Sequence, residues 1–598
     1  MKLQNIIYPS SNNCQEAELY FRSENDISYD AKTKCLSMKR NEEIVFNTYF
    51  NSFSANKWFE YTVINNVYLK INVKGYFLVE LLCIKRENGE AISTVMSKTL
   101  VDTKGKGQKI DLPFCTEERG GMFAFKITSL EGEGEFYEGG YYTNLGDVKI
   151  RNIKIGINIC TFKREEFIYK NMKLLEKTFF VGEEKSMDDK LLVYIVDNGK
   201  SLEHAKIESE HVKVFPNKNT GGAGGFTRGM IEILREKEET KITHTLLMDD
   251  DVVIQPESIF RTYTLLTTIR KEYQEAFIGG AMLRMDEVWI QTESGALWNK
   301  GDLVSRKQGL DLRDVEACIY NEVEELCDYN AWWYCVMPIK VIRNDNLPLP
   351  IFIRGDDVDY GLRNMEHLIL MNGICVWHEP FETKYSSSAY YYIFRNRLID
   401  NAINNINYPK EKFLEDIRQW FQQELFTYRY KNAQLLLNAA NDFLKGIEFL
   451  KNVDGEKLNT EIIKYGYQMK DANDLEMPVD LEKYRATTNQ HEGKIHRFVR
   501  KLLLNGMFLT AYDDAIVPMV GPHILFFYRK KRVLNYDETS GKGFVTKKEF
   551  KEFTRLIIAY MKFYRLCIKE YDTVVKQYRK RKKELYSLEN WKKWLKLT

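Results

Sequence analysis

The chain lacks the features that mark membrane-spanning, disulfide-rich and nucleic-acid-binding proteins. It has no run of about 18 apolar residues, so no membrane-spanning helix is expected. None of its ten cysteines forms a CxxC pair, which favours reduced thiols inside a cell over a disulfide framework or a zinc site. Lys and Arg number 87 against 85 Asp and Glu, so there is no basic surplus for nucleic acid. No secretory signal is recognisable. These absences predict a cytoplasmic protein that meets a membrane only at its surface.

What the chain does contain is apolar and aromatic residues, 44% and 13% of its 598 positions, enough for several folded domains. Within residues 1–150, segments such as 61–73 and 75–86 alternate between apolar and polar side chains, with turn-like stretches between them. This pattern predicts an N-terminal β-sandwich or β-barrel domain. Such a domain either positions its neighbour by packing or binds carbohydrate, and the pattern leaves both open.

Residues 151–402 alternate between apolar strands and amphipathic helices. We expect strands close to 153–162, 191–199 and 243–251, with helices between them. This alternation is typical of βαβ units and a mostly parallel, Rossmann-like sheet. Ligands of such sheets bind beyond the carboxyl ends of the strands, where this sequence places polar residues.

Residues 403–598 predict a C-terminal helical domain. Its last segment, 576–598, carries nine Lys or Arg and two Glu. This segment is either a solvated helix end or an interfacial helix on anionic lipid, with Trp591 and Trp594 at the boundary.

Asp249, Asp250 and Asp251 follow directly after an apolar strand. Three adjacent carboxylates repel one another unless a cation compensates them. On an extended chain Asp249 and Asp251 point the same way, so they can share a divalent ion that also binds phosphate oxygens. The alternative is an acidic loop or a helix cap.

Two further segments have both a structural and a functional interpretation. The glycine-rich segment 217–225 is expected as a loop before a helix that starts at Phe226, where it either binds an anion or merely connects. It lacks the GK[ST] ending of a phosphate-binding Walker loop. Trp332 and Trp333 are expected on a strand, so one can pack in the core while the other lines a cleft, or both can serve the core.

Asp356 and Asp357 follow another apolar run. Paired carboxylates beside a cleft can divide the work of accepting a proton and orienting a hydroxyl, but acidic residues also favour helix N-termini. His378 ends a short apolar segment. It is either structural or a metal ligand beside carboxylates.

In this order, the segments resemble a family-two glycosyltransferase of the GT-A fold, and more closely the polymerising UDP-galactofuranosyltransferases of cell-wall galactan synthesis. The matching segments are CTFKRE (160–165), IVDNG (195–199), PNKNTGGAGGF (216–226), MDDD (248–251), YNAWWYCVMP (329–338), FIRGDDVDYGLR (352–363), VWHE (376–379) and YYIFRNRL (391–398). The resemblance implies an N-terminal β domain (1–150), a GT-A catalytic domain (151–402) and a C-terminal helical domain (403–598).

The resemblance also implies residue roles. These are donor binding by Phe162, Arg164, Asp197, Asn219 and Asp250; metal binding by Asp249, Asp251 and His378; acceptor binding by Trp332, Trp333 and Glu293; and catalysis by Asp356 and Asp357. Phe162 and Arg164 would lie on the uracil side of UDP, with Asp197 on uracil itself. Asp357 would be the general base, and Asp356 would orient the acceptor sugar.

The implied activity is inverting, Mn²⁺- or Mg²⁺-dependent transfer of galactofuranose from UDP-galactofuranose to a cell-surface polysaccharide or a lipid-linked glycan. The resemblance further implies a homo-oligomer. The balanced charge predicts no nucleic-acid partner, and the basic C-terminal segment leaves open a peripheral contact with anionic lipid on the inner face of the cell membrane. The alternatives are a donor such as UDP-galactopyranose, UDP-glucose or dTDP-rhamnose, a hydrolase, and a non-catalytic glycan-binding protein on the same fold.

Overall fold

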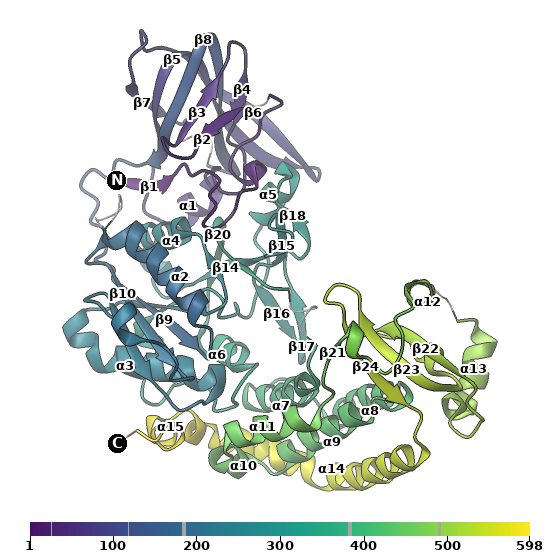
Figure 1. Ribbon diagram of the computed structural model, residues 1–598. Helices are drawn as coiled ribbons and strands as arrows, with labels where there is room; N and C mark the ends of the chain where they lie inside the picture. The colour runs from purple at the N-terminus through teal and green to yellow at the C-terminus, as the bar shows by residue number, and fades with distance from the viewer. Residues whose placement is uncertain are drawn as a thin grey trace.

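The computed structural model describes residues 1–25, 27–115, 117, 119–181, 187–380, 385–487 and 492–597. An N-terminal β region, a central α/β region and a C-terminal region follow one another along the molecule (Figure 1). All ten cysteines are free thiols. Within the described residues no helix combines the length and the apolar character needed to cross a membrane.

The N-terminal region is one eight-stranded sheet, and its described strands pair in antiparallel fashion. Two long strands, β5 and β8, form its centre, and shifts in their register between residues 72 and 77 bend the sheet. The β character predicted for residues 1–150 is thus present as one bent sheet. Its elements are β1 (Lys2–Asn5), β2 (Ser28–Asp30), β3 (Cys35–Met38), β4 (Glu43–Val45), α1 (Ala55–Tyr61), β5 (Tyr68–Glu87), β6 (Glu90–Asp102), β7 (Gln108–Pro113) and β8 (Met122–Tyr142).

The central region is built on a ten-stranded sheet with the main order β11-β10-β9-β12-β19-β14-β15-β18. Its first half contains β9 (Ile155–Thr161), α2 (Glu165–Leu175), β10 (Leu191–Asp197), β11 (Val212–Pro216), α3 (Gly221–Thr240), β12 (His244–Asp249), β13 (Val253–Ile254) and α4 (Pro256–Thr268). Its second half contains β14 (Phe277–Arg284), β15 (Ile290–Glu293), β16 (Ala296–Asn299), β17 (Asp302–Ser305), β18 (Leu310–Asp311), α5 (Val315–Asn321), β19 (Cys335–Pro338), α6 (Asp356–Asn364), β20 (Leu368–His378) and α7 (Ser387–Ile403).

The prediction of a mostly parallel sheet is only half right. Strands β9, β10, β11 and β12 are parallel, as the βαβ pattern predicted. Beyond β12 the sheet is mixed, because β19 runs antiparallel to both β12 and β14. Strand β20 returns parallel to β14. A break in the helix–strand alternation after α4 is what allows antiparallel neighbours here.

The two faces of the central sheet are covered differently. Apolar residues of α2 and α4, such as Ile168 and Ile259, share one core with the sheet, and that core continues into the N-terminal region. Phe50 of the N-terminal region packs on Trp377 of β20, with ring centroids 5.8 Å apart. The opposite face is covered by α3. The N-terminal sheet is therefore fixed against the central sheet by a shared core.

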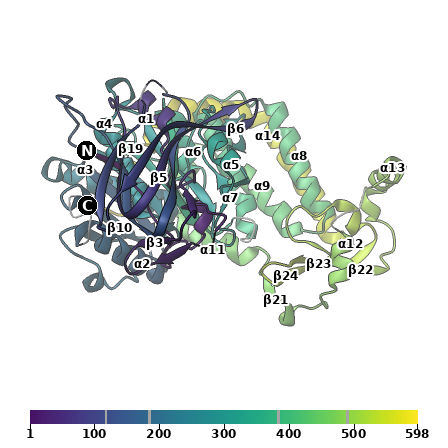
Figure 2. The ribbon, with the colours of Figure 1, turned by 90° about the horizontal axis from the view of Figure 1, so that it is seen from above.

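The C-terminal region is helical but not wholly so. Its helices are α8 (Lys410–Phe426), α9 (Tyr430–Leu444), α10 (Ile447–Asn452), α11 (Gly455–Tyr465), α12 (Leu481–Ala486), α13 (Lys494–Leu502), α14 (Phe550–Leu585) and α15 (Leu588–Leu595). A four-stranded sheet, which the sequence analysis did not predict, is formed by β21 (Lys470–Asp471), β22 (Asp513–Pro518), β23 (Lys530–Asp537) and β24 (Lys542–Lys547). This sheet and α12–α13 project away from the central region in both ribbon views (Figures 1 and 2).

The interfacial interpretation of segment 576–598 is wrong for its tryptophans. Trp591 is 0% and Trp594 9% exposed, and both join the core beneath α3. The Trp591 indole N–H donates to the carbonyl oxygen of Pro348 at 2.8 Å. Two tryptophans packed in this way cannot lie at a lipid boundary, so α15 fastens the C-terminus to the central region.

Candidate active site

The acidic triplet lies at the carboxyl end of β12, in the middle of the central sheet. Strand β12 pairs with β9 on one side and with β19 on the other. Asp249 is its last residue. The Asp250 carboxylate accepts the backbone N–H of Phe162 at 3.4 Å, which ties the triplet to the loop after β9.

Strand β20 brings His378 to this triplet, because Trp377 pairs with Val253 of β13. Asp249, Asp251 and His378 each offer a ligand atom, and these atoms lie within 4.8 Å of one another. No other such group of three or more His, Cys, Asp or Glu side chains occurs in the described part of the chain. Two carboxylates and an imidazole suit an ion of the Mn²⁺ or Mg²⁺ class, so the donor set fits the predicted metal.

Two contacts orient the His378 ring. Its Nδ1 lies 2.6 Å from the carbonyl oxygen of Glu379, and its Nε2 lies 3.2 Å from Asp251 Oδ1. Because a carbonyl oxygen only accepts, Nδ1 carries the hydrogen and Nε2 faces the carboxylates. Burial lowers the pKa of His378, but the hydrogen bond and charge of Asp251 outweigh it and raise the pKa. Burial, together with the charge of Asp251, raises the pKa of Asp249 to about 7.

Arg164 lies at this acidic cluster. Its guanidinium forms an ion pair with Asp251, and its Nε lies 4.0 Å from Asp250 Oδ1. The cation offsets part of the repulsion among the carboxylates. Phe162, two residues earlier, is 45% exposed and presents an open ring. Arg164 thus pairs with carboxylates of the acidic triplet, and its contact with the uracil side of UDP stays a prediction.

Asp197 does not reach an open surface. Its side chain is fully buried and accepts backbone N–H groups of Gly199, Ser201 and Leu202 at 2.8–2.9 Å. With its carboxylate occupied in this way, Asp197 shapes the loop after β10. The expectation that it binds uracil directly is not supported by this geometry.

The glycine-rich segment is not a loop throughout, since α3 begins at Gly221, five residues earlier than predicted. A Cβ at Gly225 would lie 1.9 Å from the Cys160 sulfur, and one at Gly221 would lie 2.1 Å from the Phe352 carbonyl oxygen. These glycines let α3 pack closely on its neighbours. Asn219, half-buried before α3, accepts the Gly221 N–H at 3.1 Å.

Helix α6 begins in a strained loop. Phe352, Arg354 and Gly355 have φ values of 77°, 65° and 93°. Left-handed conformations of non-glycine residues cost roughly 1–3 kcal/mol each and cluster at functional sites. The loop presents Asp356 and Asp357 as the first two residues of α6, where the helix dipole favours negative charge.

Asp357 is electrostatically linked to the rest of the site. Burial raises the pKa of both Asp356 and Asp357, and the charge of Asp357 raises that of Asp356 further. The Asp357 charge also contributes to the raised pKa of Asp249 and of Glu293. Asp357 therefore lies close enough to both Asp249 and Glu293 for its charge to act on them.

Glu293 ends β15 and is 5% exposed. Its carboxylate accepts a hydrogen bond from the Ser305 hydroxyl. Burial, opposed by this bond and reinforced by Asp357, raises the pKa of Glu293 to about 7. A carboxyl with this pKa can either accept or donate a hydrogen bond near neutral pH.

Trp332 and Trp333 lie in the turn before β19, not on a strand, and each is 5% exposed. Trp332 packs edge-on against Phe226 and Tyr360, with ring centroids 5.3 and 6.0 Å away. The Trp333 indole N–H donates to the carbonyl oxygen of Gly280 at 2.9 Å. The two rings enter different cores, so the expectation that one of them lines an open cleft is not met in this conformation.

Asp400 of α7 is a residue that sequence reasoning missed. It is 1% exposed, and neither carboxylate oxygen has a hydrogen-bond partner. A Cβ at Gly355 would lie 2.6 Å from its Oδ2, so Asp400 sits directly beneath the start of α6. Burial, then the charges of Asp359 and Asp357, raise the pKa of Asp400 well above its usual range. A single Asp within a helix gives no signal of this in the sequence.

Replacing Asp400 with Asn is expected to stabilise the protein increasingly as pH rises. A folded-state pKa above the unfolded value of about 3.9 means that the folded protein holds the proton more tightly, so its stability falls as pH rises through this interval. Asn does not ionise, so the Asp400→Asn protein does not lose this stability as pH rises. Calorimetry at pH 5 and pH 8 should show a larger gain in Tm for Asp400→Asn at pH 8. The exposed Asp345→Asn is the control, and an equal gain at both pH values would contradict the argument.

Known proteins and a known family resemble this chain. The family model described as "Galactofuranosyltransferase 2 N-terminal" matches residues 3–144. The galactofuranosyltransferase GlfT2 of Mycobacterium tuberculosis is 26% identical over 452 residues, 70% of this chain and 68% of that protein. GlfT2 of Mycolicibacterium smegmatis is 26% identical over 445 residues, 69% of this chain and 65% of that protein. The chain thus spans about two thirds of the length of these relatives.

Among solved structures, a CBM22-1–GH10 xylanase of Clostridium thermocellum covers 33% of this chain and 38% of its own, with 10% identity and a TM-score of 0.18. A score this low carries no argument about the fold. The sequence relatives do confirm the resemblance to galactofuranosyltransferases that the motifs predicted, and with it the prediction of a glycosyltransferase.

Proposed function

We propose that the chain transfers galactofuranose from UDP-galactofuranose to a growing cell-surface polysaccharide or a lipid-linked glycan, with inversion at the transferred carbon. The observation that carries this proposal is the convergence of Asp249, Asp251 and His378 on one point, within the electrostatic field of Asp357. Similarity to two galactofuranosyltransferases supports the donor and the acceptor class.

In this proposal Asp249, Asp251 and His378 hold Mn²⁺ or Mg²⁺, which when bound offsets negative charge on the departing diphosphate. Asp357 accepts the proton of the acceptor hydroxyl as its oxygen attacks the sugar and UDP leaves. Asp356 and Glu293 orient the acceptor by hydrogen bonds. Arg164 is paired with Asp251. When a metal binds Asp251, the guanidinium of Arg164 can instead pair with the diphosphate.

A donor panel tests the function. We expect purified protein with Mn²⁺ to release UDP from UDP-galactofuranose and to extend a galactofuranose-containing acceptor. UDP-galactopyranose, UDP-glucose and dTDP-rhamnose should react at least about tenfold more slowly, a difference of about 1.4 kcal/mol in the barrier. Faster transfer from one of these donors would reassign the substrate. Release of free sugar without transfer would indicate a hydrolase, and glycan binding without either reaction would indicate a non-catalytic protein.

The peripheral membrane contact expected from the sequence is proposed at α13. One side of this helix carries Ile495, Phe498, Val499 and Leu502, which are 83%, 68%, 42% and 72% exposed. The spacing i, i+3, i+4, i+7 makes them a single apolar stripe. Exposed Lys494 flanks it, with Arg497 and Lys501 towards the polar side.

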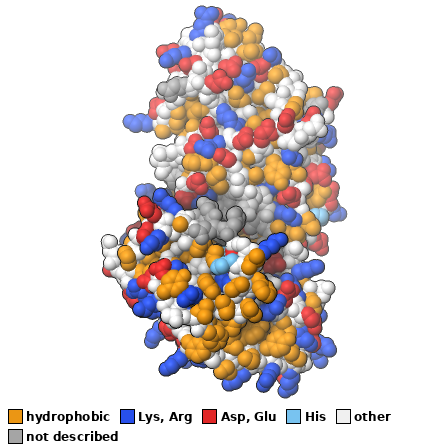
Figure 3. Space-filling view, turned by 90° about the vertical axis from the view of Figure 1, so that its right-hand side faces the viewer, with side chains coloured by type: hydrophobic (Ala, Val, Ile, Leu, Met, Phe, Trp, Pro, Cys, Tyr) orange, Lys and Arg blue, Asp and Glu red, His pale blue; other side chains and the backbone are white. Residues whose placement is uncertain are grey.

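An anionic lipid surface fits this helix in chemistry. Short apolar side chains enter the headgroup region while the lysines and Arg497 face the phosphates. Arg500 points the other way and anchors the helix to Glu492, with Nε to Oε1 at 2.7 Å. Hydrophobic side chains also gather on the lower part of the molecular face that carries α13 (Figure 3).

Vesicle binding tests the membrane proposal. Combined replacement of Ile495, Phe498 and Leu502 by Ser should lower partitioning onto phosphatidylglycerol vesicles at least about tenfold, because each buried apolar side chain contributes about 1.5–3 kcal/mol. Replacing Ile92 and Leu100 by Ser on β6, which are 41% and 62% exposed, is the control. If the α13 variant instead dissociates an oligomer in light scattering and still binds vesicles, α13 is an interface between copies of the chain.

A further inference from the structure

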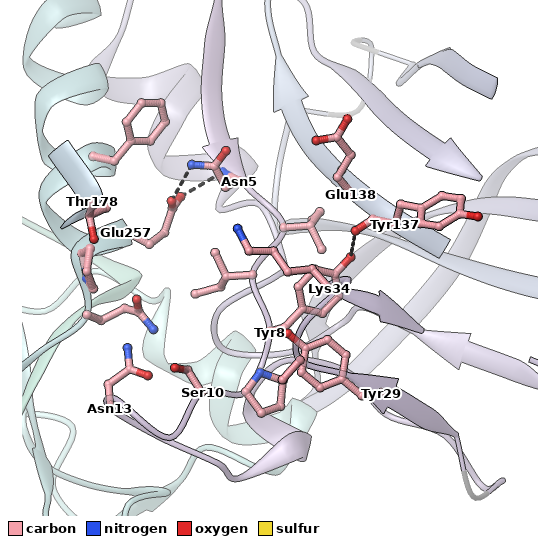
Figure 4. A pocket seen from close by; sticks show the side chains of 18 of the residues that line it. Asn5, Tyr8, Ser10, Asn13, Tyr29, Lys34, Tyr137, Glu138, Thr178 and Glu257 are labelled. Atoms are coloured by element: carbon pink, nitrogen blue, oxygen red, sulfur yellow. Dashed lines mark hydrogen bonds between the residues drawn. The ribbon is translucent and has the colours of Figure 1, made fainter. Parts of the chain in front are cut away.

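A large groove lies between the N-terminal sheet and the central region, with a volume of about 1340 Å³. Its N-terminal wall comes from the chain after β1, from β2 and from the part of the sheet where β5 pairs with β7 and β8. Its other wall comes from the start of α4 and the turn after α2. Figure 4 shows polar and aromatic side chains of both walls turned towards this space.

An aromatic platform forms part of the N-terminal wall. Tyr8 and Tyr29 are stacked, with ring centroids 5.2 Å apart and planes 22° from parallel. The Tyr8 hydroxyl donates to the carbonyl oxygen of Tyr137 at 3.1 Å, which fixes the inner ring. Tyr29 on β2 remains half-buried at the groove. A rigid aromatic face with a polar edge suits a ligand that has both an apolar face and hydroxyl groups.

The remaining lining is rich in uncharged hydrogen-bonding groups. They include the side chains of Ser11, Asn12, Gln15 and Asn72. Backbone and side-chain amides and hydroxyls of this kind can pair with a polyhydroxylated ligand in either direction.

The acidic groups of the groove are already engaged. Glu257, 5% exposed, accepts the Asn5 N–H and amide at 2.9 and 2.8 Å. Asp111 pairs with Lys70 at 2.7 Å, and Glu138 pairs with Lys109 at 3.2 Å. The described groove residues therefore offer no cluster of carboxylates for a metal or for acid–base chemistry. Lys2, Lys34 and Lys177 also line the groove, so its lining carries no excess of negative charge that would repel a polyhydroxylated ligand.

The size and the position of the groove restrict the class of ligand further. Single small-molecule sites occupy roughly 300–1,000 Å³, so this groove accommodates a longer chain. Gln255, on its wall, follows Asp251 by four residues, and four extended residues span at most about 14 Å. The wall of the groove at Gln255 therefore lies within about 14 Å of Asp251 along the chain, although no residue of the metal cluster lines the groove itself.

We propose that this groove binds a stretch of several sugar units of a glycan acceptor, away from the sugar that receives the new residue. This rests on the proposed function for the identity of the acceptor, but the binding itself does not require transfer. The groove would hold a long chain between additions, while a single-sugar acceptor would not touch it.

Calorimetry with galactofuranose oligosaccharides of increasing length tests the groove. Affinity should rise with chain length in the natural sequence, and Tyr29→Ala should weaken binding of the longest chain about tenfold, or about 1.4 kcal/mol. The matched control is Tyr512→Ala, which removes a tyrosine that is 66% exposed on the C-terminal region. In transfer assays Tyr29→Ala should lower kcat/KM for long acceptors and leave a monosaccharide glycoside unchanged.

The outcomes separate the two proposals. Chain-length-dependent binding that is lost in Tyr29→Ala supports the groove even if no donor is turned over. Normal transfer with equal affinity of Tyr29→Ala and the natural sequence for long chains would overturn the groove and leave the proposed function standing. To exclude misfolding of Tyr29→Ala, its Tm and its monosaccharide kinetics must match those of the control.

Discussion

Asp357→Asn is expected to lower kcat for sugar transfer by about 10²–10⁴-fold, the usual contribution of a general base. The amide keeps the size of the side chain but cannot take the proton of the acceptor hydroxyl. Because Asp357 begins α6 and its Oδ1 accepts the Val358 N–H at 2.9 Å, Asn can retain this local contact. The KM for the UDP-sugar should therefore change little. Initial rates of UDP release under saturating donor and acceptor measure the effect.

Two comparisons make this result specific. Asp345→Asn makes the same chemical change at an exposed carboxylate paired with Arg343, and should leave kcat unaltered. Metal affinity of Asp357→Asn, measured by Mn²⁺ titration, should stay within about threefold of the natural sequence, since Asp357 is not among the three clustered ligands. Transfer at the natural rate by Asp357→Asn would mean that another group takes the proton, and Glu293, with a pKa of about 7, is the next candidate.

The strands beside the site could be predicted from sequence because their signal is local. An apolar run that ends in Asp249, Asp250 and Asp251 already indicates a buried strand and its carboxyl end. The pairing of β13 with β20 is long-range, and nothing in the sequence between them indicates it. The proximity of His378 to the triplet therefore came from the resemblance to a known family, not from spacing.

The errors also have physical causes. A glycine run is compatible with a loop and with a helix that packs closely on a strand. Which of the two forms depends on the element that packs against the run, here Cys160 of β9 against Gly225. Trp591 and Trp594 flank two lysines, a pattern that suits both a lipid surface and a protein groove. Trp591 is buried because α3 provides apolar side chains against which it packs, and the local sequence does not reveal this partner. The four-stranded C-terminal sheet was missed because β21 is only two residues long, and because charged residues such as Asp513, Asp514 and Lys530 weaken the strand pattern of β22 and β23.

Removal of the divalent metal is expected to abolish transfer, and His378→Ala is expected to raise the Mn²⁺ concentration needed for half-maximal activity by more than about 100-fold. Loss of a direct ligand should exceed the 10–100-fold effect typical of residues that only support a ligand. The ring also fixes Asp251, through the 3.2 Å contact of Nε2 with Oδ1, so its loss disturbs two of the three donors.

The measurement is UDP release in EDTA, followed by titration with Mn²⁺ or Mg²⁺. His204→Ala, which removes an imidazole 34% exposed beside Glu208, is the matched control and should titrate like the natural sequence. A high metal concentration should partly restore the activity of His378→Ala, because Asp249 and Asp251 remain as ligands. The activity of Asp251→Ala should be restored less, because this substitution also removes the ion pair with Arg164. Full transfer in EDTA would leave the carboxylate cluster without a cation to compensate it. The ion pair of Arg164 with Asp251, and the contact of His378 with the same carboxylate, would then have to offset the repulsion in the cluster, and side chains would have to stabilise the diphosphate.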